Sequence, residues 1–194
     1  MTKQELDGIW NYYLSLERDI SKTSNYVEPL GQENVYSFEF LKLLILSCTE
    51  VESVLKLLCK ELNPNGKAGD IGMYKGIILT AFPKIVCAHV TVSRTGTQLS
   101  PFQDWDKKPL QWWDEYQIVK HGRNSYFSHA TYNNAVTALG ALYILIFYLA
   151  KHCELSFWDD EAQYLTSDYC HKLVACAPDA ELPDFEVTTN ETTI

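Results

Sequence analysis

Basic residues are scarce in this chain. Its 194 residues include 16 Lys and Arg against 25 Asp and Glu, which gives a net charge of −9. A broad, nonspecific duplex-binding surface needs many cationic contacts to phosphate, so this balance argues against such a surface. Residues 177–194 contain acids and no base, which leaves the rest of the chain only mildly acidic. A small basic pocket on that body remains compatible with the composition.

The chain also lacks the short motifs of several enzyme classes. It contains no GxGxxG and no GxxxxGK[ST], which excludes nucleotide hydrolysis by a phosphate-binding loop, and it has no GxSxG nucleophile turn. It contains no HExxH, no HxH and no Cys/His quartet at zinc spacing, and its six cysteines form no CxxC pair. We therefore expect no metal, no cofactor, and buried free thiols in place of disulfides.

Neither a secretory signal nor a membrane span is expected. The N-terminal stretch MTKQELDGIWNYY is charged and amphipathic, without the apolar run of a signal peptide. The longest apolar run, residues 135–150, is short of the ~20 residues that a span usually needs, and it includes Thr137 and Gly140. We interpret it as the buried central helix of a cytoplasmic protein that does not contact a membrane.

Hydrophobic periodicity predicts a helical bundle. Apolar residues spaced by three and four predict one helix over about residues 3–23 and a longer one from the N-cap Ser37 to about residue 62. A third helix is expected over about 71–82, with Asp70 as its cap. We therefore predict an all-α fold of about four to five helices.

A different pattern interrupts the helices. Residues 85–102 are β-branched and alternating around a Gly-containing turn, which predicts a small β-hairpin or extended excursion. Helical periodicity returns from Pro109 to about Arg123, and Thr131 is the expected cap of the central helix. We predict a single domain over residues 1–176, in which 155–176 could be helix, strand or both, and an acidic, disordered tail over 177–194.

The stretch KHGRNSYFSH gathers four candidate site residues: Lys120, His121, Arg123 and His129. On one continuous helix Arg123 and His129 would diverge by about 120°, so they can converge only if the helix stops between them. A histidine can transfer a proton near neutral pH, and an arginine can neutralise a phosphate in the transition state. RNA supplies its own 2′-hydroxyl nucleophile, so the set suits metal-independent phosphodiester cleavage. The alternative is that these cations only complement the dipole at a helix C-terminus.

The same stretch resembles a known superfamily. RNSYFSH, residues 123–129, is similar to the Arg-x4–6-His signature of HEPN domains, with Asn124 as the polar residue that often follows the arginine. Two longer stretches resemble a group of bacterial and phage HEPN-like proteins. One is WWDEYQIVKHGR followed by NNAVTALGALYILIFYL, and the other is the earlier LERDISKTSNYVEPLGQENVYSFEFLKLLILSCTEVESVLKLLC. The resemblance covers roughly residues 10–150.

The resemblance implies a HEPN-like helical bundle that acts as a metal-independent endoribonuclease in a defence or toxin–antitoxin context. It implies a homodimer with paired sites, RNA as substrate, a 2′,3′-cyclic phosphate product, and a possible antitoxin or regulatory protein partner. By position, Arg123 would bind the scissile phosphate, His129 would be acid or base, and Asn124 would orient the phosphate or the histidine. Lys120 and His121 would bind substrate. The alternative is a catalytically inactive HEPN-like module that binds a protein partner or a nucleotide.

Overall fold

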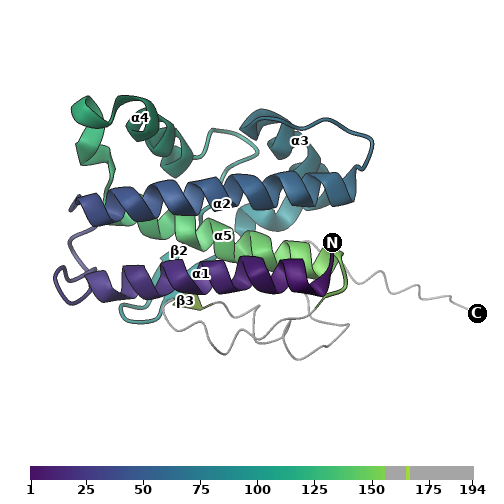
Figure 1. Ribbon diagram of the computed structural model, residues 1–194. Coiled ribbons are helices and arrows are strands. Elements are labelled where there is room, and N and C mark those ends of the chain that lie inside the picture. The colour runs from purple at the N-terminus through teal and green to yellow at the C-terminus, as the bar shows by residue number, and fades with distance from the viewer. Residues whose placement is uncertain (156–164, 167–194) are drawn as a thin grey trace, which may run out of the picture.

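The computed structural model describes residues 1–155, 165 and 166, which form the architecture in Figure 1. Three long helices, α1 (Lys3–Thr23), α2 (Phe38–Leu62) and α5 (Tyr132–His152), run side by side, and α5 packs against both of the others. The predicted tail over 177–194 lies outside the described residues, as does most of the segment 155–176.

Helix α5 forms the centre of the core. Every residue from Ala138 to Ala150 is buried, so the helix has no solvent-facing side over that stretch. Its length and composition would suffice to cross a membrane, but 89% of its most apolar window is buried inside this fold. The described part of the chain thus has the form of a globular domain, and the predicted buried central helix is confirmed.

Side-chain caps set the beginnings of three helices, as the sequence predicts. The Ser37 hydroxyl accepts a hydrogen bond from the Phe40 amide at 3.1 Å, and the Asp70 carboxylate accepts from the first turn of α3 (Ile71–Ala81). The Thr131 hydroxyl accepts from the Asn134 amide at 3.2 Å. Each cap satisfies amide groups that have no partner within the helix.

Helices α3 and α4 (Gln111–Tyr126) lie on the side of α2 that faces away from α1, toward opposite ends of α2 (Figure 1). Helix α4 buries four residues against the bundle: Trp112, Trp113, Tyr116 and Val119. A short 3-10 turn, η2 (Phe127–His129), joins it to α5. This junction contains the candidate site residues.

The predicted excursion contains a hairpin. After the 3-10 turn η1 (Pro83–Cys87), strand β1 (Val90–Val92) pairs antiparallel with β2 (Thr97–Leu99). Strand β3 (Leu165–Thr166) pairs with the other edge of β1, which gives the order β2-β1-β3. The prediction of a mainly helical bundle with a small hairpin is confirmed, and β3 adds a strand within the segment that the sequence left undecided.

A buried carboxylate of α1 fixes β3. Glu17 accepts hydrogen bonds from the Leu165 amide and the Tyr13 hydroxyl, both at 3.0 Å. A buried charge is costly unless it is hydrogen-bonded, so these two donors account for a glutamate in the core. The contact joins residues 148 positions apart in the chain and so attaches β3 to the bundle.

Candidate functional site

A bend at Gly122 shapes the end of α4. Gly122 has φ −139° and ψ 38°, which interrupts the helix before its last turn. A Cβ atom at this position would lie 2.6 Å from Cδ2 of Tyr126, so the close approach of that ring requires glycine. The sequence predicts a helix end near Arg123; the structure has the bend one residue earlier and a further turn to Tyr126. That turn carries Arg123 and Asn124.

A pocket of about 410 Å³ opens at this bend. Its apolar floor comes from Ile45 of α2 and Val119 of α4, and the chain from residue 120 to 125 forms its rim. The rim includes four of the five predicted site residues: Lys120, His121, Arg123 and Asn124. The structure therefore gathers three basic side chains and one amide around one concave surface.

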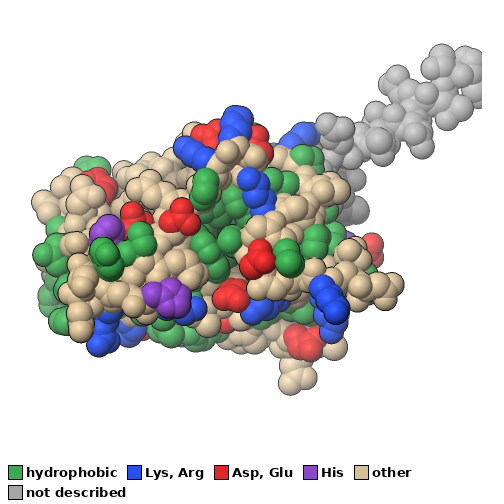
Figure 2. Space-filling view, turned by 90° about the horizontal axis from the view of Figure 1, so that it is seen from above, with side chains coloured by type: hydrophobic (Ala, Val, Ile, Leu, Met, Phe, Trp, Pro, Cys, Tyr) green, Lys and Arg blue, Asp and Glu red, His purple; other side chains and the backbone are tan. Residues whose placement is uncertain are grey.

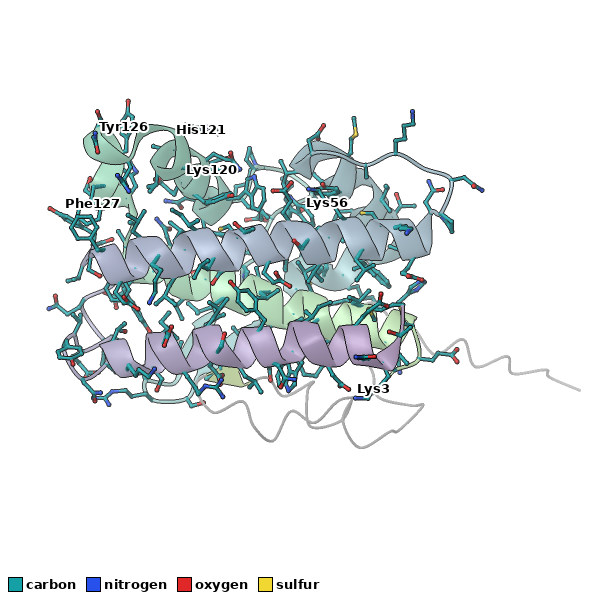
Figure 3. All side chains as sticks on the ribbon, in the orientation of Figure 1. Lys3, Lys56, Lys120, His121, Tyr126 and Phe127 are labelled. Carbon is teal, nitrogen blue, oxygen red and sulfur yellow. The ribbon has the colours of Figure 1, made fainter. Side chains whose placement is uncertain are left out.

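Lys120 is oriented by the helix that carries it. Its Nζ lies over the Tyr116 ring, 5.2 Å from the ring centroid, and Figure 3 shows it between α4 and α2. The hydrogen bond with Tyr116 is the largest cause that raises the pKa of Lys120 above its ordinary value, with a smaller contribution from the Glu52 carboxylate. Lys120 is therefore a permanent positive charge at neutral pH.

Arg123 and His121 are exposed on the rim. Within residues 1–155, 165 and 166, neither side chain forms an ion pair. An arginine without a carboxylate partner keeps its planar fork of donors for an incoming anion, which it can bind through two parallel hydrogen bonds. Arg123 is thus suited to bind a phosphate group.

His129 occupies a different position from the other four residues. Its Nδ1 contacts Oε2 of Glu115, a residue of α4 that lies 14 positions earlier in the chain. Its main-chain carbonyl accepts a hydrogen bond from Nδ2 of Asn134 at 2.9 Å, and its ring meets the edge of Tyr126 at 5.8 Å. His129 is not part of the pocket lining.

The geometry of α4 explains this separation. Glu115 and Lys120 are five residues apart, so they diverge by about 140° around the helix axis. They flank the buried stripe on opposite sides, and η2 folds back on the Glu115 side. The structure therefore brings together Lys120, His121, Arg123 and Asn124, and it holds His129 at the opposite flank of the same helix.

Three contributors to this region were not singled out from the sequence. Tyr116 orients Lys120, Glu115 holds the His129 ring, and Asn134 holds the His129 backbone. The Tyr116 contact joins neighbouring turns of one helix, so spacing alone could have found it. The Glu115 contact depends on how η2 folds back, which no local pattern encodes.

Among the residues with described positions, no three His, Cys, Asp or Glu side chains lie close enough together to hold a metal ion. No protein-family model, no curated protein and no solved structure matches the chain.

Proposed function

We propose that this chain is a metal-independent endoribonuclease of the HEPN type. The observation that carries the proposal is that one helix, α4, contacts Nδ1 of His129 through Glu115 and also carries Lys120 and Arg123 on the pocket rim. A carboxylate that binds one imidazole nitrogen fixes the tautomer and orientation of the ring, and the second nitrogen is then positioned for proton transfer. The resemblance of RNSYFSH to the HEPN signature supports the same assignment.

In this proposal His129 is the acid–base residue. Its side chain is 37% exposed, and its Nε2 has no hydrogen-bond partner among the described residues. Nε2 would accept the proton of an RNA 2′-hydroxyl, and the 2′-oxygen would form a bond to the adjacent phosphorus. The bond from phosphorus to the 5′-oxygen would break, and that oxygen would take up a proton. The products would be a 2′,3′-cyclic phosphate and a free 5′-hydroxyl.

The pocket residues would stabilise the phosphate during this step. Arg123 would donate two hydrogen bonds to the nonbridging oxygens, and the fixed charge of Lys120 would lower the energy of the developing dianion. Asn124 would orient the phosphate, and His121 would bind a neighbouring part of the substrate. All four lie on the rim of the 410 Å³ pocket.

The proposal includes a homodimer in which the pockets of two copies face one another, as the HEPN resemblance implies. A partner copy could bring its own His129 toward the pocket that this copy forms. The cellular setting proposed is defence or a toxin–antitoxin pair, in which a regulatory protein restrains cleavage. The mass of the protein in solution, measured by light scattering, tests whether it is a homodimer.

Cleavage of a mixed single-stranded RNA in the presence of EDTA tests the activity. We expect fragments that end in a 2′,3′-cyclic phosphate, and we expect His129→Gln and Arg123→Ala to slow cleavage by about 10²- to 10⁴-fold. His152→Gln, at the other end of α5, is the matched control and should cleave like the wild type. A His129→Gln protein with full activity would contradict the proposal.

One observation favours a second candidate, a catalytically inactive module that binds a nucleotide or a protein partner. His129 lies outside the pocket lining, so the pocket by itself is a binding site for an anion without an acid–base residue. This candidate predicts binding that depends on Arg123 and is unchanged in His129→Gln. It also predicts no RNA cleavage at any protein concentration, with or without EDTA.

A further inference from the structure

Three aromatic rings form an exposed cluster at the end of the bundle where α4 meets η2. They are Tyr36, Phe38 and Phe127, and we call them the aromatic platform. The Phe38 and Phe127 rings stack with centroids 4.5 Å apart, and Tyr36 meets Phe127 edge-on at 5.4 Å. Phe38 is 73% exposed and Tyr36 is 50% exposed, although burial of such rings would be favourable. Figure 2 shows hydrophobic side chains exposed at this end, near histidines.

Backbone contacts attach the segments that carry the platform to α2 and α5. Phe38 is the first residue of α2, directly after the Ser37 cap, and Tyr36 forms a β-bridge with Thr131. The preceding loop is attached to the start of α5, because the Val35 carbonyl accepts from the Tyr132 amide at 2.8 Å. Phe127 lies in η2, labelled in Figure 3 beside Tyr126. Rings ordered in this way lose little further entropy when a ligand stacks on them.

The platform adjoins the basic pocket. Phe127 is two residues beyond Ser125 on the pocket rim, so their Cα atoms are at most about 7.6 Å apart. Phe127 and Ile45 both pack on the small cluster of Leu41, Val119 and Ala130, and Ile45 and Val119 are the floor of the pocket. One hydrophobic support therefore carries both the rings and the cationic rim.

We propose that the aromatic platform stacks an unpaired base of single-stranded RNA whose adjacent phosphate occupies the Lys120–Arg123 pocket. The inference rests on the proposed function and adds the residues that select unpaired RNA. Charge complementarity assigns the occupant: the platform borders a rim with Lys120, His121 and Arg123, and the nearest acid on α2, Glu39, is paired with Lys42 at 2.5 Å. Stacking on aromatic rings beside a cationic groove is the general mode of single-strand recognition.

Two RNA probes that cannot be cleaved distinguish base stacking on the platform from charge attraction to the phosphates. Both are fluorescein-labelled 2′-O-methyl oligomers of equal length and charge, one of uridines and one with abasic sites in place of the bases. We expect Phe38→Ala to weaken binding of the uridine oligomer roughly 5- to 150-fold and to leave binding of the abasic oligomer unchanged. Phe38→Trp should restore the loss. Arg123→Ala should weaken both probes and reduce the salt dependence of binding.

Met73→Ala is the matched control, because Met73 is also an exposed apolar side chain and lies on α3, toward the other end of α2 (Figure 1). The inference is overturned if Phe38→Ala binds both probes like the wild type, or if the wild type binds neither. It is also overturned if Phe38→Ala changes a dimer into a monomer and still binds the uridine oligomer more tightly than the abasic one. That result would mean that a second copy of the chain covers the platform. If the wild type prefers the uridine oligomer but never cleaves unmodified RNA, the proposed cleavage activity is contradicted and base stacking on the platform is supported.

Discussion

At the scale of single residues, the contact between Glu115 and His129 determines what this region can do. Without a partner, a histidine in a short 3-10 turn would sample several rotamers, and its ring nitrogens would have no defined direction. Glu115 removes that freedom through Nδ1, and Asn134 holds the backbone of the same residue. Glu115 is therefore a positioning residue in the proposed cleavage, because it acts through His129.

Glu115→Gln tests this role. The amide keeps the shape of the side chain but loses the negative charge that orients the ring and stabilises it when protonated. We expect kcat for RNA cleavage to fall by about 10-fold or more and KM to stay within about 2-fold, since Glu115 is not on the pocket rim. Steady-state kinetics measure both. A rise in KM with unchanged kcat would instead assign Glu115 to substrate binding.

The described thiols are unequal in reactivity. Burial raises the pKa of Cys59 to about 11 and that of Cys48 well above its ordinary value, whereas Cys87 is exposed. The thiolate is the reactive form, so a buried thiol with a pKa of about 11 is a poor nucleophile at neutral pH. This agrees with a reaction that takes its nucleophile from RNA.

Alkylation by iodoacetamide at pH 7.5, followed by peptide mass spectrometry, tests the thiols. We expect Cys87 to react at least about 10²-fold faster than Cys59 in the folded protein and at a similar rate in urea. The pKa of Cys59 is raised by folding, so its contribution to the free energy of unfolding is fully present below pH ~8 and is lost as pH rises toward 11. Equal labelling in the folded state would mean that α2 opens locally.

At the scale of elements, close contact between α5 and the hairpin depends on a glycine. A Cβ atom at Gly140 would lie 2.9 Å from Cγ2 of Val90 and 3.4 Å from Cγ of Pro101. In an exposed helix interior, alanine is more stable than glycine by up to about 1 kcal/mol. For a change of Gly140 to alanine, the higher helix propensity would therefore stabilise the fold, whereas the contact with Val90 would destabilise it.

Gly140→Ala measures which effect is larger. Overpacking of a tight core contact costs about 1–3 kcal/mol, so we expect this variant to unfold at lower urea concentration than the wild type. Gly8→Ala is the matched control, because Gly8 is a helical glycine with nothing within 4 Å of an added Cβ. That control should gain about 0.5–1 kcal/mol. A stabilised Gly140→Ala protein would show that β1 moves away from α5 without penalty.

At the scale of the whole molecule, α5 joins three of the other helices. It packs against α1, α2 and α4, and its N-terminus is joined to the loop before α2 by the bridge between Tyr36 and Thr131. The Leu145 side chain is fully buried at the centre of the core cluster. Burial of the apolar surface of this helix is thus a large source of stability for the bundle.

Leu145→Ala should lower the free energy of unfolding by about 2–5 kcal/mol, because it removes buried methyl groups and leaves a cavity. The matched control is Leu30→Ala, because the Leu30 side chain is 64% exposed. It should change the free energy of unfolding by less than about 0.5 kcal/mol. Urea denaturation followed by circular dichroism measures both. Similar small effects in the two variants would mean that Leu145 does not face a packed core.

Local sequence is enough to predict the helices and the starting points of α2, α3 and α5, whereas α4 begins at Gln111, two residues after Pro109, without a side-chain cap. Periodic apolar residues and the caps Ser37, Asp70 and Thr131 act within a few positions of one another, so local physics is enough to predict them. The composition of residues 135–150 likewise predicted the central helix, because a helix that is apolar on all sides and shorter than a usual membrane span packs in a protein core. The basic rim of the pocket was also predictable from local sequence, because its residues are neighbours in the chain: Lys120, His121, Arg123 and Asn124.

What lies beside these elements depends on the tertiary structure. The Gly122 bend directs four candidate residues into one pocket, and η2 places His129 against Glu115. The pairing of β3 with β1, and the meeting of Tyr36, Phe38 and Phe127, join segments that are distant in the chain. Such contacts depend on how whole elements pack, because their energy comes from partners that no local pattern specifies.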